Sequence, residues 1–249
     1  MEEEEPRATA QFLCEAMRCD GKFDICVVDT RHTLHNRIHK PDLNMHPLRR
    51  FHVGFEIIEG LKRMERDTRL QQHLAKLNPH WILLGAEDQV FLKVRETGAV
   101  PPDKGLGMNA LENDNLHRWI APELGQNDHT FTGSTKEATS REDLRAASVF
   151  SLGLVLLEME TGIVPFGEID GVNAQRQLGT GTRPNMTNVL TEMKELISEC
   201  LDVDKTARPT LEKVQERLVE IGQKSNQLTS EEAQSIQEQL KKKTVLASI

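Results

Sequence analysis

Hydrophobic and polar residues alternate along the first half of the chain with periods that predict a strand, a helix and a hairpin. The segment KFDICVVD, residues 22–29, is rich in β-branched side chains and follows a glycine, so it predicts a strand. Apolar residues then return at every third or fourth position from Leu48 to Met64, which is the spacing of one helical face. WILLG and QVFLKV, on either side of an acidic turn at residues 86–88, predict a short hairpin.

The second half of the chain is predicted to be helical. AASVFSLGLVLLEME, residues 146–160, is apolar nearly all round, so we expect a helix buried in the core. Glycine and proline in TGIVPFG end it. Two amphipathic helices follow, one from Met193 to Leu201 and one from Leu211 to Leu218, the second capped by Thr210. Long loops are predicted at residues 98–116 and 125–140.

Composition restricts the class of protein. The formal net charge of −8 argues against binding to nucleic acid or to anionic membranes, and no apolar run is long enough to cross a bilayer. The start, MEEEEP, is acidic where a secretory signal is basic and then apolar. We therefore expect an intracellular, cytoplasmic protein whose partners are other proteins.

Cysteine and histidine give two candidate sites for metal or redox chemistry. The cysteines have no zinc-type spacing and are predicted to be free thiols: Cys14, Cys19, Cys26 and Cys200. His32, His35 and His39 would share one face of a helix, a spacing that suits metal ligands. No carboxylate or cysteine stands nearby in the sequence to complete the set, so the segment is interpreted as a solvated face and no metal is predicted.

Four stretches of the chain carry a resemblance: HRWIAPEL, SVFSLGLVLLEMETGIVPF, ECLDVDKTARPT and ICVVDTRHTLHNRI. They resemble motifs of the protein kinase family. HRWIAPEL contains the Ala-Pro-Glu that closes the activation segment of kinases, and SVFSLGLVLLEMETGIVPF resembles the buried helix that follows. ECLDVDKTARPT resembles the late Arg-Pro segment, and ICVVDTRHTLHNRI resembles the strand, hinge and first helix between the lobes. The resemblance implies an α+β, mainly α-helical fold: a kinase-like large lobe with a remnant of the small-lobe sheet.

The resemblance also implies a domain organisation. We expect an acidic lead and small-lobe remnant over residues 1–21, a kinase-like domain over 22–221, and a helical or flexible tail over 222–249. Because the family has four further strands and a helix before the hinge, the small lobe is expected to be truncated. One edge of the strand at 22–29 would then be unpaired, a geometry that favours a partner strand or self-association.

The family pairs the glutamate of Ala-Pro-Glu with the arginine of the late motif, which here implies a structural ion pair between Glu123 and Arg208.

The catalytic loop of the family aligns with HLAKLNPHWILL, and the residues that carry phosphoryl transfer are replaced in it. Lys76 replaces the catalytic base, and an ammonium has no lone pair to accept a proton. Asn78 replaces a phosphate-contacting lysine, and Trp81 replaces the magnesium-binding asparagine.

Two further positions depart from the family. Glu96 stands where the magnesium-binding aspartate is expected, so it is the one weak candidate for holding a cation. Ser148 replaces the aspartate that steadies the catalytic loop. Residues 105–107, Gly-Leu-Gly, lie in a predicted loop and are not interpreted as a nucleotide cradle.

These departures predict a catalytically inactive pseudokinase that acts as a scaffold or regulatory binding module and needs no cofactor. The alternative is a divergent Ser/Thr protein kinase that retains weak ATP and magnesium binding and phosphotransfer, and a third interpretation is a domain fragment without a role.

The tail and one loop offer further candidates for binding or modification. Thr229 and Glu232 form a capping-box pattern at the start of a predicted helix. The helix would carry a narrow apolar stripe made of Ala233, Ile236 and Leu240. This stripe would dock on a partner, or the segment is a solvated helix without a partner. Candidate phosphoacceptors, or plain linker residues, are Ser134, Thr135, Thr139 and Ser140.

Overall fold

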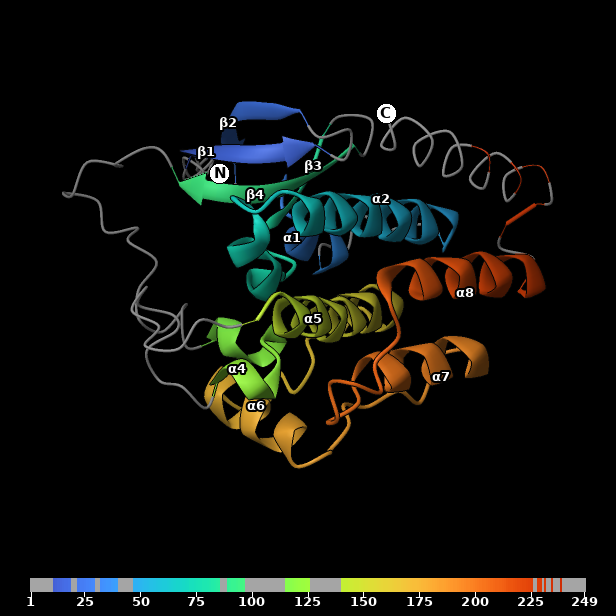
Figure 1. The fold of residues 1–249 in the computed structure, drawn as a ribbon. Helices are drawn as coiled ribbons and strands as arrows, with labels where there is room; N and C mark the ends of the chain where they lie inside the picture. Colours follow the sequence, from blue (N-terminus) through green and yellow to red (C-terminus); the bar gives the residue numbers. More distant parts are fainter. Residues whose placement is uncertain are drawn as a thin grey trace, which may run out of the picture.

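A stack of helices lies against one small antiparallel sheet at one end of the molecule (Figure 1). The computed structural model describes residues 11–18, 22–29, 32–39, 47–85, 89–96, 115–125, 140–225, 228, 229, 231, 234 and 238. The predicted class, α+β and mainly helical, is confirmed.

Four strands form a single sheet in the order β2-β1-β4-β3. Its members are β1 (Gln11–Arg18), β2 (Phe23–Asp29), β3 (Ile82–Leu84) and β4 (Val90–Glu96). β3 and β4 form the predicted hairpin, and β1 joins it to β2 by pairing with both neighbours. The strand predicted at residues 22–29 therefore lies at an edge, with a strand neighbour on one side only in the described part of the chain.

The sheet is fixed to the helical body by close packing on α2 (Pro47–Arg66). Met17 of β1 and Leu92 of β4 are ladder partners, and both are buried. A Cβ on Gly60 of α2 would lie 2.6 Å from Cδ1 of Leu92, so this position requires a residue without a side chain. The strand and the helix approach each other because Gly60 leaves room.

The helix α5 (Arg141–Thr161) is the centre of the molecule. Every residue from Ala147 to Met159 is buried, as the all-round apolar pattern predicts. Figure 1 shows α5 between α2 on one side and α6 and α7 on the other. The helix begins five residues before the predicted start because Ser140 caps it, accepting a hydrogen bond from the Asp143 amide at 3.0 Å. It ends at Gly162, whose φ of +66° is left-handed.

The remaining helices complete the body around α5. They are α1 (Leu34–His39), η3 (Gln71–Lys76), η5 (His117–Trp119), α4 (Pro122–Gly125), α6 (Gly171–Gly179), α7 (Thr191–Cys200) and α8 (Leu211–Lys224). The two predicted amphipathic helices are α7 and α8, and Thr210 caps α8 as predicted, accepting from the Lys213 amide at 3.3 Å.

Helix α6 and the short helical turn η5 were not expected from the apolar pattern. In α6, Ala174 and Leu178 are the buried apolar residues with helical spacing, and a glycine stands at each end, so the periodic signal is weak. Its start is set instead by Asp170, which accepts from the Asn173 amide at 2.8 Å. Residues 115–116 are also helical, so the predicted loop at 98–116 ends earlier than expected.

Several predictions fall partly or wholly outside the described residues. These are the acidic turn at 86–88, the glycines at 105–107, most of both long loops, and the apolar stripe of the tail. Within the tail, Leu228 is buried and its amide donates to the carbonyl of Gly222 at 2.9 Å. Among the described helices, none combines the length and apolar character that crossing a membrane requires.

Candidate functional site

The loop for which the sequence predicts the place of the kinase catalytic loop lies between η3 and β3, and η3 packs against the central helix α5. Asn78 sets the shape of this loop. Its side-chain amide donates to the carbonyl of Lys76 at 2.9 Å, and its oxygen accepts from the His80 amide at 3.0 Å. The Asn78 side chain is buried, so both of its polar ends are used within the loop.

Trp81, for which the sequence resemblance predicts a metal-binding asparagine in the family, has two lysines close to its ring. The Nζ atom of Lys76 lies 5.8 Å from the ring centroid, and the Nζ atom of Lys93 on β4 lies 5.3 Å from it. The Lys93 amide also donates to the carbonyl of Trp81 at 2.9 Å, which fixes the two backbones together. Each cation–π contact is worth ~0.5–2 kcal/mol. The arrangement brings two ammonium groups close to one aromatic ring.

Glu96 lies at the end of a strand and Ser148 lies within the central helix. Glu96 is the last residue of β4, and in the ladder its Cα partner is Cys14 of β1. The hydroxyl of Ser148 is buried and donates to the carbonyl of Arg145 at 2.8 Å, one turn back along α5. This hydrogen bond satisfies the hydroxyl within its own helix, so Ser148 does not use it to steady the catalytic loop.

Glu123 and Arg208 form a two-pronged ion pair. Nη1 and Nη2 of Arg208 donate to the two oxygens of Glu123 at 2.6 and 2.9 Å. Arg208 also donates from Nε to the carbonyl of Asp202 at 2.8 Å and from Nη1 to that of Ala146 at 3.0 Å. Its guanidinium lies 4.8 Å from the ring centroid of Phe150. Because the Arg208 side chain is 1% exposed, this pair fixes the Ala-Pro-Glu segment to α5 and to the turn before α8.

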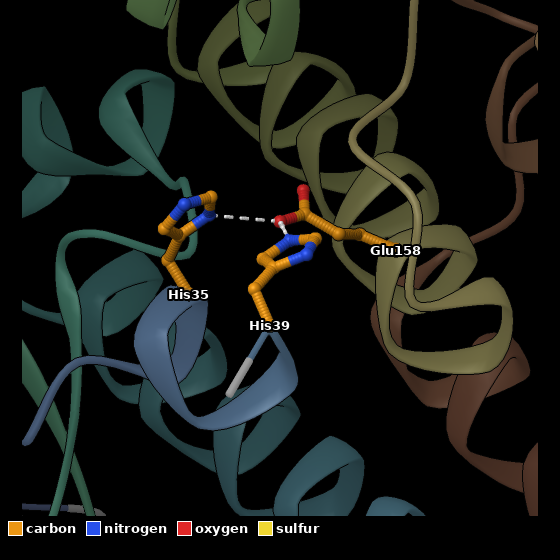
Figure 2. A group of neighbouring side chains, drawn as sticks. All are labelled: His35, His39 and Glu158. Atoms are coloured by element: carbon orange, nitrogen blue, oxygen red, sulfur yellow. Dashed lines mark hydrogen bonds and ion pairs between the residues drawn. The ribbon is translucent and has the colours of Figure 1, made fainter. Parts of the chain in front are cut away.

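A second polar cluster lies between α1 and α5 (Figure 2). His35 Nδ1 and His39 Nε2 both contact Oε1 of Glu158, at 3.1 and 2.9 Å. The indole N–H of Trp119 donates to the other oxygen, Oε2, at 3.1 Å. His32, the third histidine of the sequence motif, is exposed and lies outside this group.

Electrostatics at this cluster favour an ionised glutamate. Burial by itself raises the pKa of Glu158, but the hydrogen bonds from His35 and His39 outweigh it, so the net shift of the pKa is downward. His80 stacks on His35 with ring centroids 4.0 Å apart and meets Trp119 edge-on. Burial, reinforced by His35, lowers the pKa of His80 to about 4, so that ring is neutral near neutral pH.

One feature of the sequence, a charged residue inside an apolar helix, indicated this cluster, although the spacing of apolar residues did not. Glu158 is a charged residue within an apolar, buried helix, and a buried carboxylate requires partners. Those partners are 119 and 123 residues away in the chain, so neighbouring residues gave no indication of them. No carboxylate stands nearby in the sequence, but the fold brings Glu158 to His35 and His39, so the interpretation of these two residues as part of a solvated face is wrong.

Other candidate residues have structural roles or lie outside the described chain. Ser140 is the cap of α5, while Ser134, Thr135 and Thr139 are outside the described residues. Cys200 is a buried free thiol, as predicted, and burial raises its pKa to about 12.

Comparisons with known proteins identify the family of the chain. Residues 27–218 match the family described as protein tyrosine and serine/threonine kinase. The chain is 27% identical over 194 residues to probable serine/threonine-protein kinase pats1 of Dictyostelium discoideum, a match covering 76% of this chain and 6% of that protein. It is 42% identical over 156 residues to mitogen-activated protein kinase kinase kinase 1b of Physcomitrium patens, covering 62% and 18%.

Mitogen-activated protein kinase kinase kinase 1 of Arabidopsis thaliana is 33% identical over 157 residues, covering 62% of this chain and 23% of that relative. The chain therefore spans less than a quarter of the length of each of these three relatives.

Proposed function

Because the chain belongs to the protein tyrosine and serine/threonine kinase family, we propose that it is a pseudokinase, a kinase-like domain that acts by binding other proteins and does not transfer phosphate. The observation that carries this proposal is Trp81, whose ring has the ammonium groups of Lys76 and Lys93 at 5.8 and 5.3 Å from its centroid. Magnesium takes oxygen ligands, and an indole supplies none.

The position of the catalytic base supports the same proposal. Phosphoryl transfer in kinases uses an aspartate of this loop to accept the proton of the substrate hydroxyl. Lys76 offers an ammonium there, and that ammonium faces Trp81. A general base contributes roughly 10²–10⁴-fold to rate, and loss of the metal ligand removes electrostatic stabilisation of the transition state as well.

The test is the thermal melting of the purified chain with and without ATP, in magnesium, manganese or EDTA, followed by a phosphotransfer assay. A ligand that binds the native state raises the melting midpoint. We expect a cooperative melt whose midpoint does not respond to nucleotide in any of the three conditions, and no phosphate transfer. The matched variant is Lys76→Asp combined with Trp81→Asn, which restores the family residues at both positions.

The alternative function, a divergent Ser/Thr kinase with weak ATP binding, predicts a different result. Glu96 retains a carboxylate at the end of β4 where the family has its magnesium-binding aspartate. A metal-dependent rise in the midpoint that Glu96→Ala abolishes, together with phosphate transfer, would overturn the pseudokinase proposal. A shift produced only by the double variant would support it, because the shift would assign the loss to Lys76 and Trp81.

We further propose that the binding function uses the edge of the sheet at β2. This strand is last in the order β2-β1-β4-β3, and edge strands pair readily with a strand from another chain. Self-association is the simplest form of this pairing. Light scattering at tens of micromolar tests it: Val27→Pro, which removes one backbone N–H, should lower the mass of the species, and a monomeric parent chain would refute it.

The relatives suggest where such a module would act. Two of those compared are named as mitogen-activated protein kinase kinase kinases, so we propose that the chain serves in a protein assembly of kinase signalling. Its partner would be a protein, and neither nucleic acid nor a membrane surface is proposed.

A further inference from the structure

Three potential metal ligands converge where α1 meets α5. His35 and His39 are one helical turn apart, so their rings leave α1 on the same side. Glu158 reaches them from α5, and Figure 2 shows the three side chains pointing toward one another. Each residue offers one ligand atom, a ring nitrogen or a carboxylate oxygen, and these atoms all lie within 4.8 Å of one another.

We propose that His35, His39 and Glu158 form a binding site for a divalent first-row transition metal, with Zn²⁺ as the favoured ion. Two imidazole nitrogens and one carboxylate oxygen are the donor types that zinc takes. Magnesium and calcium select oxygen ligands, so the two nitrogens argue against both. Three protein ligands leave a fourth tetrahedral position for water or for a group supplied by a partner.

The spacing of the ligand atoms suits a tetrahedral ion. Nitrogen and oxygen lie about 2.0–2.2 Å from zinc, so two tetrahedral ligands are about 3.3 Å apart. In the structure Oε1 of Glu158 is 3.1 Å from His35 Nδ1 and 2.9 Å from His39 Nε2. These distances need to open by only a few tenths of an ångström, which side-chain rotation supplies. The ion would replace the hydrogen bonds that now join the imidazoles to the carboxylate.

The surroundings orient the carboxylate and leave a route for the ion. Trp119 donates its indole N–H to Oε2 at 3.1 Å, which turns Oε1 toward the histidines. Ligating carboxylates in metal sites are commonly held by such an outer hydrogen bond. The Glu158 side chain is fully buried, whereas those of His35 and His39 are 22% and 25% exposed. An ion would therefore enter past the imidazoles and be anchored by the carboxylate behind them.

Bound metal would link the segment after β2 to the central helix. α1 has six residues, and short helices depend on tertiary contacts for their stability. A metal bound between α1 and α5 stabilises the folded state in proportion to its occupancy. Its ligands are not the catalytic-loop residues on which the pseudokinase proposal depends, so the two proposals are tested separately.

The experiment uses the full chain, stripped with EDTA and then exchanged into metal-free buffer. Zn²⁺ binding is measured by competition with a chromophoric chelator, and the thermal midpoint is recorded with Zn²⁺, Mg²⁺ or EDTA. Co²⁺ serves as a spectroscopic probe, because tetrahedral cobalt with nitrogen ligands absorbs strongly in the visible. We expect one equivalent of Zn²⁺, a raised midpoint with Zn²⁺ but not with Mg²⁺, and the visible cobalt bands.

The informative variants are His35→Gln and His39→Gln. Glutamine can still donate an N–H to Glu158, so it preserves the hydrogen bond while removing the metal ligand. Each should weaken Zn²⁺ binding at least tenfold. His52→Gln, at an exposed histidine of α2, is the control and should bind as the parent does.

Three results would overturn the proposal: no stoichiometric zinc binding, equal affinity in His39→Gln, or loaded cobalt without intense visible bands. The cobalt spectrum of the parent chain decides the matter even where a variant fails to fold.

Discussion

Breaking the ion pair between Glu123 and Arg208 should destabilise the chain by an amount that depends on which partner is removed. Glu123→Gln keeps one acceptor oxygen but leaves the guanidinium, whose side chain is 1% exposed, without its counter-charge. Losing one partner of a buried pair costs roughly 3–5 kcal/mol. Because glutamine retains a hydrogen bond and two carbonyls still accept from Arg208, we expect about 2–3 kcal/mol here.

Arg208→Met should cost more. It removes both hydrogen bonds to Glu123, those to the carbonyls of Asp202 and Ala146, and the contact with the ring of Phe150. The Glu123 side chain is 22% exposed, so water partly compensates the stranded carboxylate, and we expect a loss of about 3–4 kcal/mol. For a domain of this size that is roughly a 6–16 °C fall in the melting midpoint.

The assay is a double-mutant cycle measured by urea unfolding, followed by tryptophan fluorescence. Residues in direct contact show coupling energies of ~0.5–3 kcal/mol, and this two-pronged, largely buried pair should reach about 2 kcal/mol. Glu199 and Arg217 are the matched control, a pair with contacts of 3.0 and 2.9 Å whose side chains are 48% and 21% exposed. Their coupling should stay below ~1 kcal/mol. Equal coupling in the two pairs would refute the reasoning.

Three other predictions follow from packing and burial. Gly153→Ala should destabilise the chain by ~1–3 kcal/mol in urea unfolding, because the new Cβ would lie 2.7 Å from Cβ of Cys200. Gly54→Ala is the control: its new Cβ would have its nearest neighbouring atom at 3.5 Å, so this variant should be neutral or stabilising. Burial raises the pKa of Glu65 although Arg145 opposes it, so the folded state holds the proton more tightly and the contribution of Glu65 to stability falls as pH rises through its pKa. Glu65→Gln should thus be at least as stable as the parent at neutral pH and lose that advantage below pH 4.5, the ordinary pKa of the glutamate. A lower free energy of unfolding for the variant than for the parent at neutral pH would contradict this. The thiol of Cys200, with a pKa of about 12, should react with a thiol reagent only after unfolding, as peptide mass spectrometry would show; rapid labelling of the native chain would contradict its burial.

The parts of the fold that the sequence predicted are those in which one strong local pattern decides the structure. The apolar run at 146–160 could only be a buried helix, and α5 is that helix. Helix α6 escaped prediction because its start depends on a single cap, Asp170, and its apolar face consists of few residues. The pairing of β1 with β4 is equally invisible to local pattern, since Cys14 and Glu96 are far apart in the chain.

The candidate sites differ in the same way. Glu123 and Arg208 are 85 residues apart, and the family resemblance, not periodicity, predicted that they would pair. No such guide existed for His39 and Glu158, which meet across 119 residues. A charged residue in a buried helix predicts that a polar partner exists, but the partner itself can be identified only from the packing of α1 on α5.

The union of both hairpins in one sheet has a consequence for how the chain matures. β1 is synthesised about 80 residues before β4, its second partner in the sheet. At ~5–20 residues per second the hairpin of β1 and β2 therefore exists for roughly 4–16 s before β4 has been made. Contacts between such distant segments also slow folding on release from the ribosome. During that interval both edges of the hairpin are open, which exposes these strands to pairing with strands of other chains.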